Sequence, residues 1–312
     1  MPLLPHLARS PVVLPPFVLL FLAAILLGLA GCRENERSAR KPTEPAPPQL
    51  AVAPTPTGYT RLPFDSATAA LEAVLARTRA RVLAFGEVHA PRGARAPSAT
   101  EHFRQELLPS LAPRAAALVV EAWQPAGCDA KVEAAVAQAN REIVQQQSER
   151  NPNEYLALAQ AAKALGVLPL PLRPTCEESA RVQGAGAADI DVLLQTVRLV
   201  AERTLDEAVR RSKPEAGTAK LVLFYGGALH NDLEPAPERA RWSFGPALDR
   251  TTDGGFVEVD LVVPEFIGET DTWKSLPWRS AYDAARDGSR VQLLTRNGKS
   301  FVLVLAATPK PD

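Results

Sequence analysis

The sequence predicts an α/β fold with a mainly parallel sheet that is flanked by helices and extended by a C-terminal antiparallel β-hairpin. Two observations indicate this fold. Apolar runs of strand length, such as 81–85, 117–120 and 221–225, alternate with longer helical stretches, and this alternation is typical of parallel sheets built from βαβ units. Near the C-terminus, Asn297-Gly298 separates two further apolar runs, which is the strongest short signal of a hairpin.

Helices are expected on both sides of these strands. The first helix begins near Asp65 or Ser66, because both residues are suitable N-caps. Gly166 marks the end of a later helix, since glycine often follows the last helical residue. The sequence favours further helices over four stretches: 99–111, 129–149, 153–165 and 187–211.

The remaining strands complete one predicted α/β domain over 61–312. The run 167–172 contains two prolines, which fit an edge strand or a bulge better than the centre of a sheet. Another strand covers 255–263, and the hairpin strands cover 291–296 and 300–305.

The N-terminus has the pattern of a lipoprotein signal peptide over residues 1–31. Its unbroken apolar run, 17–30, is shorter than the ~20 residues that span a bilayer. The run leads to Leu-Ala-Gly-Cys at 29–32, which resembles a bacterial lipobox, so Cys32 is the expected lipidation site. The alternative is an uncleaved membrane anchor, and in both cases the folded part lies outside the cytoplasm.

A tether is expected between the lipidated cysteine and the domain. Residues 32–60 are rich in Pro, Glu, Arg, Ala and Thr, and such a segment cannot bury a core and stays extended. It would hold the domain at the cell membrane, facing the periplasm. Arg33 is not the acidic residue that often retains lipoproteins at the inner membrane, so the outer membrane is preferred.

The charge balance argues against nucleic acid as a partner. Lys plus Arg and Asp plus Glu both number 35, so the net charge is +0, whereas nucleic-acid binding needs a basic surface. Apolar residues make up 46% of the chain and charged residues 22%, as in a globular protein. The expected partners are a small-molecule or peptide ligand and, through the anchor, the membrane.

Two cysteines remain once Cys32 carries lipid. Cys128 and Cys176 each lie a few residues beyond a predicted strand, so both can reach one end of the sheet. In an oxidising compartment an even pair is expected to form a disulfide. Two buried free thiols are the alternative.

Polar residues follow four of the predicted strands at the point where each strand ends. Gly-Glu-Val-His at 86–89 follows the first strand, Glu121 the second, Arg173 the third, and Gly-Gly-Ala-Leu-His at 226–230 the fourth. Ligands of open α/β sheets gather at the carboxyl ends of the strands. Glycine directly after a strand permits a sharp turn and a close backbone approach. We therefore expect these side chains to converge in one pocket.

The residue types in this pocket suit two kinds of chemistry. Two His and two Glu side chains can hold a divalent metal with an open position for a reactive water. Without a metal, one His or Glu would act as general base and another Glu as acid, while Arg173 would stabilise an oxyanion. Asn231 and Asp232 would orient His230. The predicted metal ligands and catalytic residues are Glu87, His89, Glu121 and His230.

These motifs resemble the Tiki superfamily, which gathers ChaN-like haem-binding lipoproteins, TraB-like proteins, erythromycin esterases and Tiki metalloproteases. The resemblance covers roughly residues 80–306 and is strongest to the ChaN-like branch. His102, in the stretch 101–106, looks like the His-x-x-Gln of the first helix of that branch, so it is expected to line the cofactor pocket. The positions shared with the superfamily are Glu87, His89, Glu121 and His230.

Three functions remain open. The first is a hydrolase, metal-assisted or not, that cleaves an ester or an amide in the periplasm. The second is a haem-binding lipoprotein in iron uptake, for which Tyr155 and Tyr282 are candidate haem ligands. The third is a site that has lost its chemistry and serves as an interaction surface. The expected cofactor is accordingly a divalent metal or haem.

Overall fold

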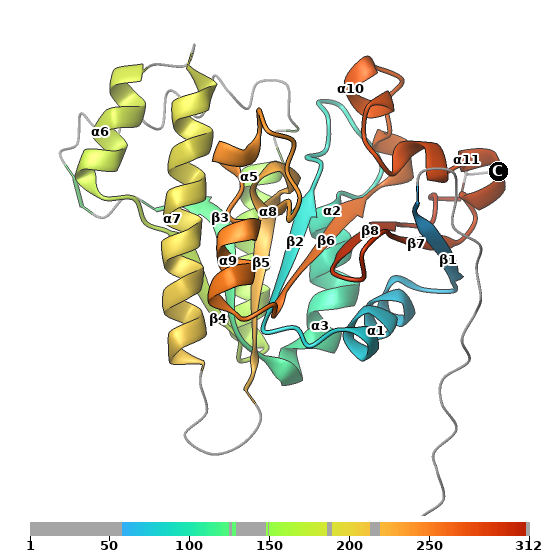
Figure 1. Ribbon diagram of the computed structural model, residues 1–312, viewed down its shortest axis with the longest axis horizontal. Helices are drawn as coiled ribbons and strands as arrows, with labels where there is room; N and C mark the ends of the chain where they lie inside the picture. Colours follow the sequence, from blue (N-terminus) through green and yellow to red (C-terminus); the bar gives the residue numbers. More distant parts are fainter. Residues whose placement is uncertain are drawn as a thin grey trace, which may run out of the picture. The chain divides into compact units, whose positions relative to one another are not determined.

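The structure, a computed structural model, contains one sheet of eight strands flanked by helices (Figure 1). It describes residues 58–124, 127, 128, 148, 150–185, 189–212 and 219–309. The predicted signal peptide, Cys32, most of the tether and most of the helix at 129–149 lie outside these residues. Within the described ranges, no helix combines the length and the apolar character that crossing a membrane requires.

The sheet is mixed and has the strand order β1-β7-β8-β6-β2-β5-β3-β4. The strands are β1 (Thr60–Phe64), β2 (Val82–Glu87), β3 (Ala115–Trp123), β4 (Leu168–Leu172), β5 (Leu221–Gly227), β6 (Phe256–Val262), β7 (Val291–Thr295) and β8 (Ser300–Val304). Neighbours from β8 through to β4 are parallel, whereas β7 is antiparallel to both β8 and β1. The predicted α/β class and the C-terminal hairpin of β7 and β8 are confirmed.

The two edges of the sheet differ in how well the sequence predicts them. Strand β4 is an edge strand and carries Pro169 and Pro171, as predicted. Strand β1, at the other edge, was not predicted, because its five residues include a proline and an arginine and show no clear alternation. Leu62 in β1 is buried, and the strand forms by pairing with β7 from the far end of the chain.

The helices largely follow the predicted ranges. Ser66 caps α1 by accepting a hydrogen bond from the Ala69 N–H at 3.1 Å. The run predicted at 99–111 is helical throughout but includes five π-helical residues, Phe103–Leu107. Gly166, just after α5, has a φ of +77°, which favours glycine. The α-helices are α1 (Ala67–Arg77), α2 (Ala99–His102), α3 (Leu108–Leu111), α5 (Asn151–Ala164), α6 (Cys176–Ala185), α7 (Ile190–Arg211), α8 (Ala228–Asn231), α9 (Gly245–Thr251), α10 (Asp271–Lys274) and α11 (Ala284–Asp287).

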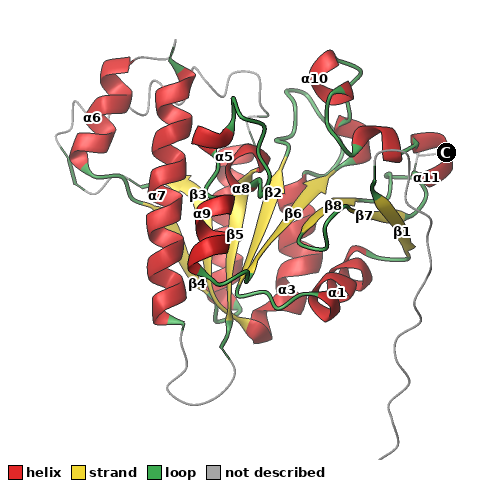
Figure 2. Cartoon of the chain, viewed as in Figure 1, coloured by secondary structure: helices red, strands yellow, loops and turns green. Residues whose placement is uncertain are grey.

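Helices cover both faces of the sheet (Figure 2). Alternate residues of β2 point to opposite faces. Leu83 and Phe85 pack with α1, α3 and α5, whereas Val82 and Ala84 pack with α7 and α9. Because β2 is buried on both faces, its polar side chains can reach solvent only near its carboxyl end.

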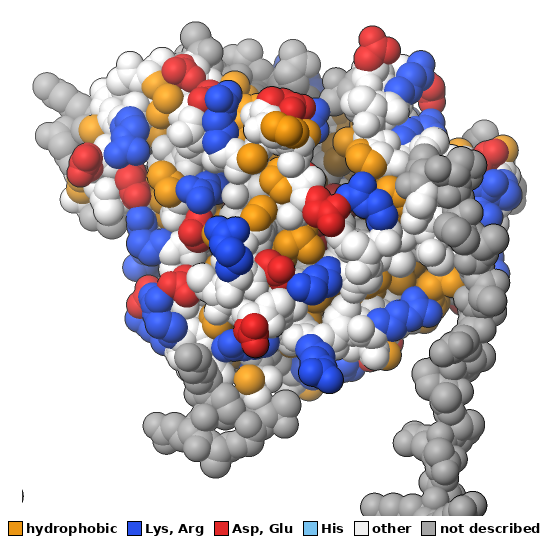
Figure 3. All heavy atoms as spheres, in the orientation of Figure 1, with side chains coloured by type: hydrophobic (Ala, Val, Ile, Leu, Met, Phe, Trp, Pro, Cys, Tyr) orange, Lys and Arg blue, Asp and Glu red, His pale blue; other side chains and the backbone are white. Residues whose placement is uncertain are grey.

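The viewed surface mixes both signs of charge, in keeping with the zero net charge of the chain (Figure 3). On α7, for example, Arg210 pairs with Asp206, and Arg203 pairs with Glu178 of α6 at 2.8 Å. Exposed pairs of this kind contribute little to stability.

Candidate active site

The carboxyl ends of β2, β5 and β3 lie side by side. Glu87 in β2 is in register with Gly227 in β5, and Val120 in β3 is in register with Tyr225. The first G-x-x-H motif therefore leaves the sheet beside the second, and Glu121 leaves it on the other side of β5.

The Glu87 carboxylate lies at the centre of a buried hydrogen-bond network. Its Oε1 accepts from the Tyr155 hydroxyl at 2.7 Å and lies 2.7 Å from His89 Nδ1. Its Oε2 accepts from the Tyr225 hydroxyl at 2.7 Å and from the Thr100 hydroxyl at 2.9 Å. The Glu87 side chain is 2% exposed and that of His89 is 27% exposed. Four donors thus occupy both carboxylate oxygens, and the imidazole connects the network to solvent.

Glu87 and His89 favour each other's charged forms. Burial alone would raise the pKa of Glu87, but the hydrogen bond and charge of His89, helped by Tyr155 and Tyr225, lower it. Burial alone would lower the pKa of His89, but the hydrogen bond and charge of Glu87 and the charge of Glu121 raise it. The carboxylate is therefore ionised, and His89 is a stronger base than a free imidazole.

Glu121 and His230 form the opposite side of the site. Glu121 Oε2 accepts from the Gly227 N–H at 2.7 Å, and Glu121 Oε1 lies 3.6 Å from His230 Nε2. His230 is buried, and its Nδ1 lies 2.9 Å from the Trp242 carbonyl oxygen. Because a carbonyl oxygen can only accept, Nδ1 carries the hydrogen. The other ring nitrogen, Nε2, faces the Glu121 carboxylate.

Three of the predicted residues converge beside Gly227. A Cβ on this glycine would lie 3.6 Å from Glu121 Oε2 and 3.8 Å from both His89 Nε2 and His230 Cδ2. A Cβ on Gly226 would lie 2.4 Å from Glu121 Oε2, so Glu121 can occupy its place only against a glycine. The convergence expected from the strand ends is thus present. We call Glu87, His89, Glu121 and His230 the strand-end cluster.

Arg173 and His102 are not part of this cluster. Arg173 is exposed, and its guanidinium donates to the Gln124 side chain at 3.1 Å. The register between β3 and the edge strand β4 shifts after Val120, and the chain beyond β4 runs to α6, which carries Arg173 away. His102 Nδ1 pairs with Glu106 of the same helical run at 2.7 Å. Among the described residues, the side-chain hydrogen bonds of Arg173 and His102 go to Gln124 and Glu106 and not to the strand-end cluster. The oxyanion role of Arg173 and the pocket role of His102 stay predictions.

Asn231 and Asp232 do not orient His230, contrary to prediction. The Trp242 carbonyl does so, as described above. Asn231 Nδ2 instead donates to the Ala84 carbonyl at 3.2 Å, and Asp232 accepts from the Glu234 N–H at 2.9 Å. The Asn231 side chain thus bonds to the backbone of β2, and that of Asp232 bonds to the loop that follows α8.

Several residues at this edge of the sheet were missed by the sequence analysis. Thr100 and Tyr225 resemble ordinary helix and strand residues, and no local pattern marks them as partners of Glu87. Asp260 could have been found, because Glu258 and Asp260 alternate within the otherwise apolar strand β6. Acidic residues on one face of a buried strand need a special environment.

The strand-end cluster does not fit the predicted four-ligand metal site. Among the residues that the structure describes, no three His, Cys, Asp or Glu side chains are grouped so as to hold a metal ion. The oxygens of Glu87 are already occupied by four hydrogen-bond donors. Glu87 therefore orients His89 rather than serving as a ligand.

The candidate haem ligands do not fit a haem site either. The Tyr155 hydroxyl donates to Glu87, and Tyr282 is buried in a separate apolar cluster with Trp278. Two surface cavities, of about 380 and 200 Å³, lie along α7 and are lined by residues other than these tyrosines and the strand-end cluster.

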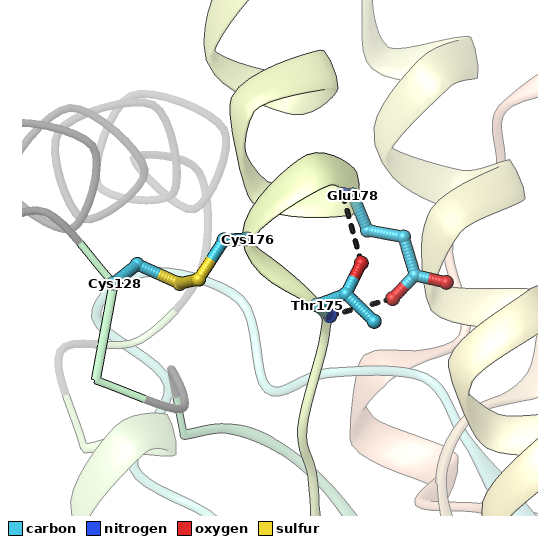
Figure 4. The surroundings of a disulfide bond; sticks show 4 residues. All are labelled: Cys128, Thr175, Cys176 and Glu178. Atoms are coloured by element: carbon cyan, nitrogen blue, oxygen red, sulfur yellow. Dashed lines mark hydrogen bonds between the residues drawn. A yellow bond between two sulfur atoms is a disulfide. The ribbon is translucent and has the colours of Figure 1, made fainter. Parts of the chain in front are cut away.

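Cys128 and Cys176 form a disulfide, as predicted (Figure 4). Cys176 begins α6, whose first turn is closed by a reciprocal cap. The Glu178 N–H donates to Thr175 Oγ1 at 3.1 Å, and the Thr175 N–H donates to the Glu178 carboxylate at 2.7 Å. The disulfide thus ties the chain that follows β3 and Glu121 to the capped end of α6.

Comparisons with protein-family models, with curated proteins and with solved structures found no match to this chain.

Proposed function

We propose that the chain is a hydrolase that cleaves an ester or an amide by acid–base catalysis at the strand-end cluster. The observation that carries this proposal is the 2.7 Å contact between Glu87 and His89 Nδ1. It leaves His89 Nε2 facing the point beside Gly227 where Glu121 and His230 also converge. A basic nitrogen oriented by a buried carboxylate is the arrangement that general-base catalysis needs.

In this mechanism His89 Nε2 removes a proton from a water molecule while the water oxygen attacks the substrate carbonyl carbon. Glu87 stabilises the imidazolium that forms. The Glu121 carboxylate also lies beside this point, so it can accept the second hydrogen of the water. When the tetrahedral intermediate breaks down, the imidazolium returns its proton to the leaving oxygen or nitrogen.

The test is a screen of the purified protein against chromogenic esters and peptides of varied size. His89→Gln is expected to lower kcat by about 100-fold or more, the contribution of a general base. His102→Gln is the matched control, because it removes an imidazole outside the cluster and should leave kcat unchanged. Full activity in the His89→Gln protein would rule out the mechanism. The resemblance to a superfamily that includes esterases and metalloproteases supports the same class of reaction.

We further propose that the enzyme lies outside the cytoplasm and is held at the membrane by a lipid on Cys32. The outer membrane is the preferred location. The disulfide between Cys128 and Cys176 supports an oxidising compartment. Metabolic labelling with a radioactive fatty acid should mark the wild-type chain and not the Cys32→Ala variant. Equal labelling of both would exclude this anchor.

A further inference from the structure

Asn231 has a buried side-chain oxygen without a hydrogen-bond partner. The residue is 0% exposed, and Oδ1 has no donor within reach in the described structure. The amide cannot be turned over to improve this, because Nδ2 donates to the Ala84 carbonyl at 3.2 Å, and a carbonyl oxygen only accepts. A buried acceptor of this kind is costly unless a donor reaches it.

Asp260 is the neighbour that can supply such a donor. It lies in β6 in register with Gly86 of β2, and its Oδ1 lies 3.3 Å from Asn231 Nδ2. A Cβ on Gly86 would lie 2.4 Å from Asp260 Oδ1 and 2.6 Å from Asn231 Oδ1. Both oxygens therefore crowd over the same glycine. Because Asn231 Nδ2 donates to Asp260 Oδ1, the Asp260 carboxyl lies against the same amide, and a proton on this carboxyl would give Asn231 Oδ1 the donor that it lacks.

We propose that Asp260 is a positioning residue that holds a proton and donates it to Asn231 Oδ1, and thereby fixes the α8 turn that carries His230. As a role in catalysis, this inference rests on the hydrolase proposal. The hydrogen bond itself does not, since it can be tested without a substrate.

The charges around Asp260 favour its protonated form. Burial and the charge of Asp232 together raise the pKa of Asp260 to about 7, against the opposing effect of the hydrogen bond from Asn231. Glu258, two residues earlier in β6, is also buried, and burial and the charges of Asp260 and Asp232 raise its pKa. Three carboxyl groups thus share one small region, and each makes ionisation of the others harder.

The other charged and titratable groups that face this region lie at its rim. Burial raises the pKa of the Tyr59 hydroxyl, and the charges of Glu258, Asp260 and Asp232 raise this pKa too. Glu234 adds a further negative charge beside Asp232. Two cations, Arg239 and Arg296, act on the acidic groups of this region, and Arg296 is paired with Glu234. In the part of the chain that the structure describes, these cations act on Asp232 and Tyr59, and neither forms an ion pair with the Asp260 carboxyl.

The α8 turn is the element that this hydrogen bond would hold. His230 and Asn231 are consecutive, so fixing the Asn231 amide also fixes the backbone of His230. The Phe244 N–H donates to the His230 carbonyl at 2.9 Å. The protection of the Phe244 amide from hydrogen exchange therefore reports on the position of the α8 turn. When Asp260 ionises, Asn231 Oδ1 loses its donor and faces a negative charge.

The first measurement is infrared difference spectroscopy of the full chain between pH 5.5 and 8.5, with ¹³C in the aspartate side-chain carboxyls. This label separates aspartate from the protonated Glu258. The wild type is expected to show an aspartic-acid carbonyl band that disappears with a midpoint near pH 7. The band should be absent in Asp260→Asn, and its midpoint should fall in Asp232→Asn because a neighbouring negative charge is removed. A band that persists in Asp260→Asn, or no aspartic-acid band in the wild type, would overturn the proposal.

The second measurement is hydrogen exchange of the segment 227–244, corrected for the intrinsic effect of pH. Protection in the wild type should fall about tenfold across the same midpoint, the change expected for one lost hydrogen bond. In Asp260→Asn the new amide can donate to Asn231 Oδ1 at every pH, so protection should stay at the low-pH level. Protection that is independent of pH in the wild type would show that Asp260 does not position the turn. Should no hydrolytic activity be found, both measurements still decide this inference.

Discussion

Glu121 accepts a hydrogen bond from the Gly227 N–H at 2.7 Å, which joins the end of β3 to the turn that begins the second G-x-x-H motif. The two residues are 106 positions apart in the chain. This contact brings the carboxylate against two consecutive glycines of β5, and the glycines respond differently to substitution.

Gly226→Ala is expected to destabilise the protein, whereas Gly227→Ala is expected to leave its stability nearly unchanged. A methyl group on Gly226 would lie 2.4 Å from Glu121 Oε2 and 2.7 Å from Phe224 Cζ, which is too close. Relieving such overpacking costs about 1–3 kcal/mol. The methyl group on Gly227 meets its neighbours at 3.6 Å or more, and its φ of −66° suits alanine.

These two variants also separate folding from catalysis. The methyl group of Gly227→Ala would occupy the point where His89, Glu121 and His230 converge, so it should lower kcat about tenfold or more by displacing the attacking water. Urea unfolding and kinetics on both variants provide the measurement. A stable and fully active Gly227→Ala protein would show that the chemistry takes place elsewhere.

Glu87→Gln is expected to move the acidic limb of the pH–rate profile to lower pH. The hydrogen bond and charge of Glu87 raise the pKa of His89, and the reaction needs the deprotonated imidazole, so activity in the wild type rises as pH rises through that raised pKa. Removing the charge lowers the pKa of His89. The maximal kcat should also fall, by about 100-fold, because the imidazolium loses its counter-charge.

The pH dependence of kcat/KM for both proteins tests this assignment. Glu106→Gln is the control, since Glu106 pairs with His102 outside the cluster. An acidic limb that stays in place, or that moves to higher pH, would contradict the role given to Glu87.

Asp287→Asn is expected to lower the free energy of unfolding by about 2 kcal/mol, because it weakens the hydrogen bonds and ion pairs of a buried carboxylate with two partly exposed arginines. Asp287 accepts from Arg61 at 2.7 Å and from Arg286 at 2.7 Å. Burial would raise the pKa of Asp287, but Arg286, the Asp283 N–H and Arg61 lower it to about 2. The stability that Asp287 contributes is therefore present above about pH 4 and lost as pH falls toward 2.

Chemical denaturation of wild type and variant between pH 2 and 7 is the measurement. The free energies of unfolding of the wild type and of Asp287→Asn should approach each other as pH falls below 4. Asp271→Asn, at an exposed position in α10, serves as the control and should match the wild type throughout. A difference in the free energy of unfolding that stays constant down to pH 2 would contradict the assignment of a stabilising negative charge to Asp287.

Removing the disulfide is expected to destabilise the domain by up to about 4 kcal/mol, the loop-closure estimate for a separation of 48 residues. Cys128→Ser with Cys176→Ser should unfold at lower denaturant concentration than the oxidised wild type. The wild type measured in reductant should coincide with the double variant. If reductant lowered the stability of the double variant as well, the effect would not come from this disulfide.

The sequence by itself determined most strands of the sheet, the hairpin and the strand ends. Alternating apolar runs are a local property of the chain, since a strand such as β2 that is buried on both faces must be apolar until it ends. The positions of Glu87, His89, Glu121 and His230 at strand ends follow from the same pattern. Strand β1 does not, because its stability comes from a partner at the other end of the chain.

Only the tertiary structure decided which polar groups meet. Tyr225 and Thr100 reach Glu87 through the packing of a strand against a helix, and the Trp242 carbonyl selects the tautomer of His230. Arg173 follows a strand just as Glu121 does, yet the edge position and shifted register of β4 carry it away. Hydrogen-bond partners depend on distances of a few ångströms between distant segments, and local sequence patterns do not encode such distances.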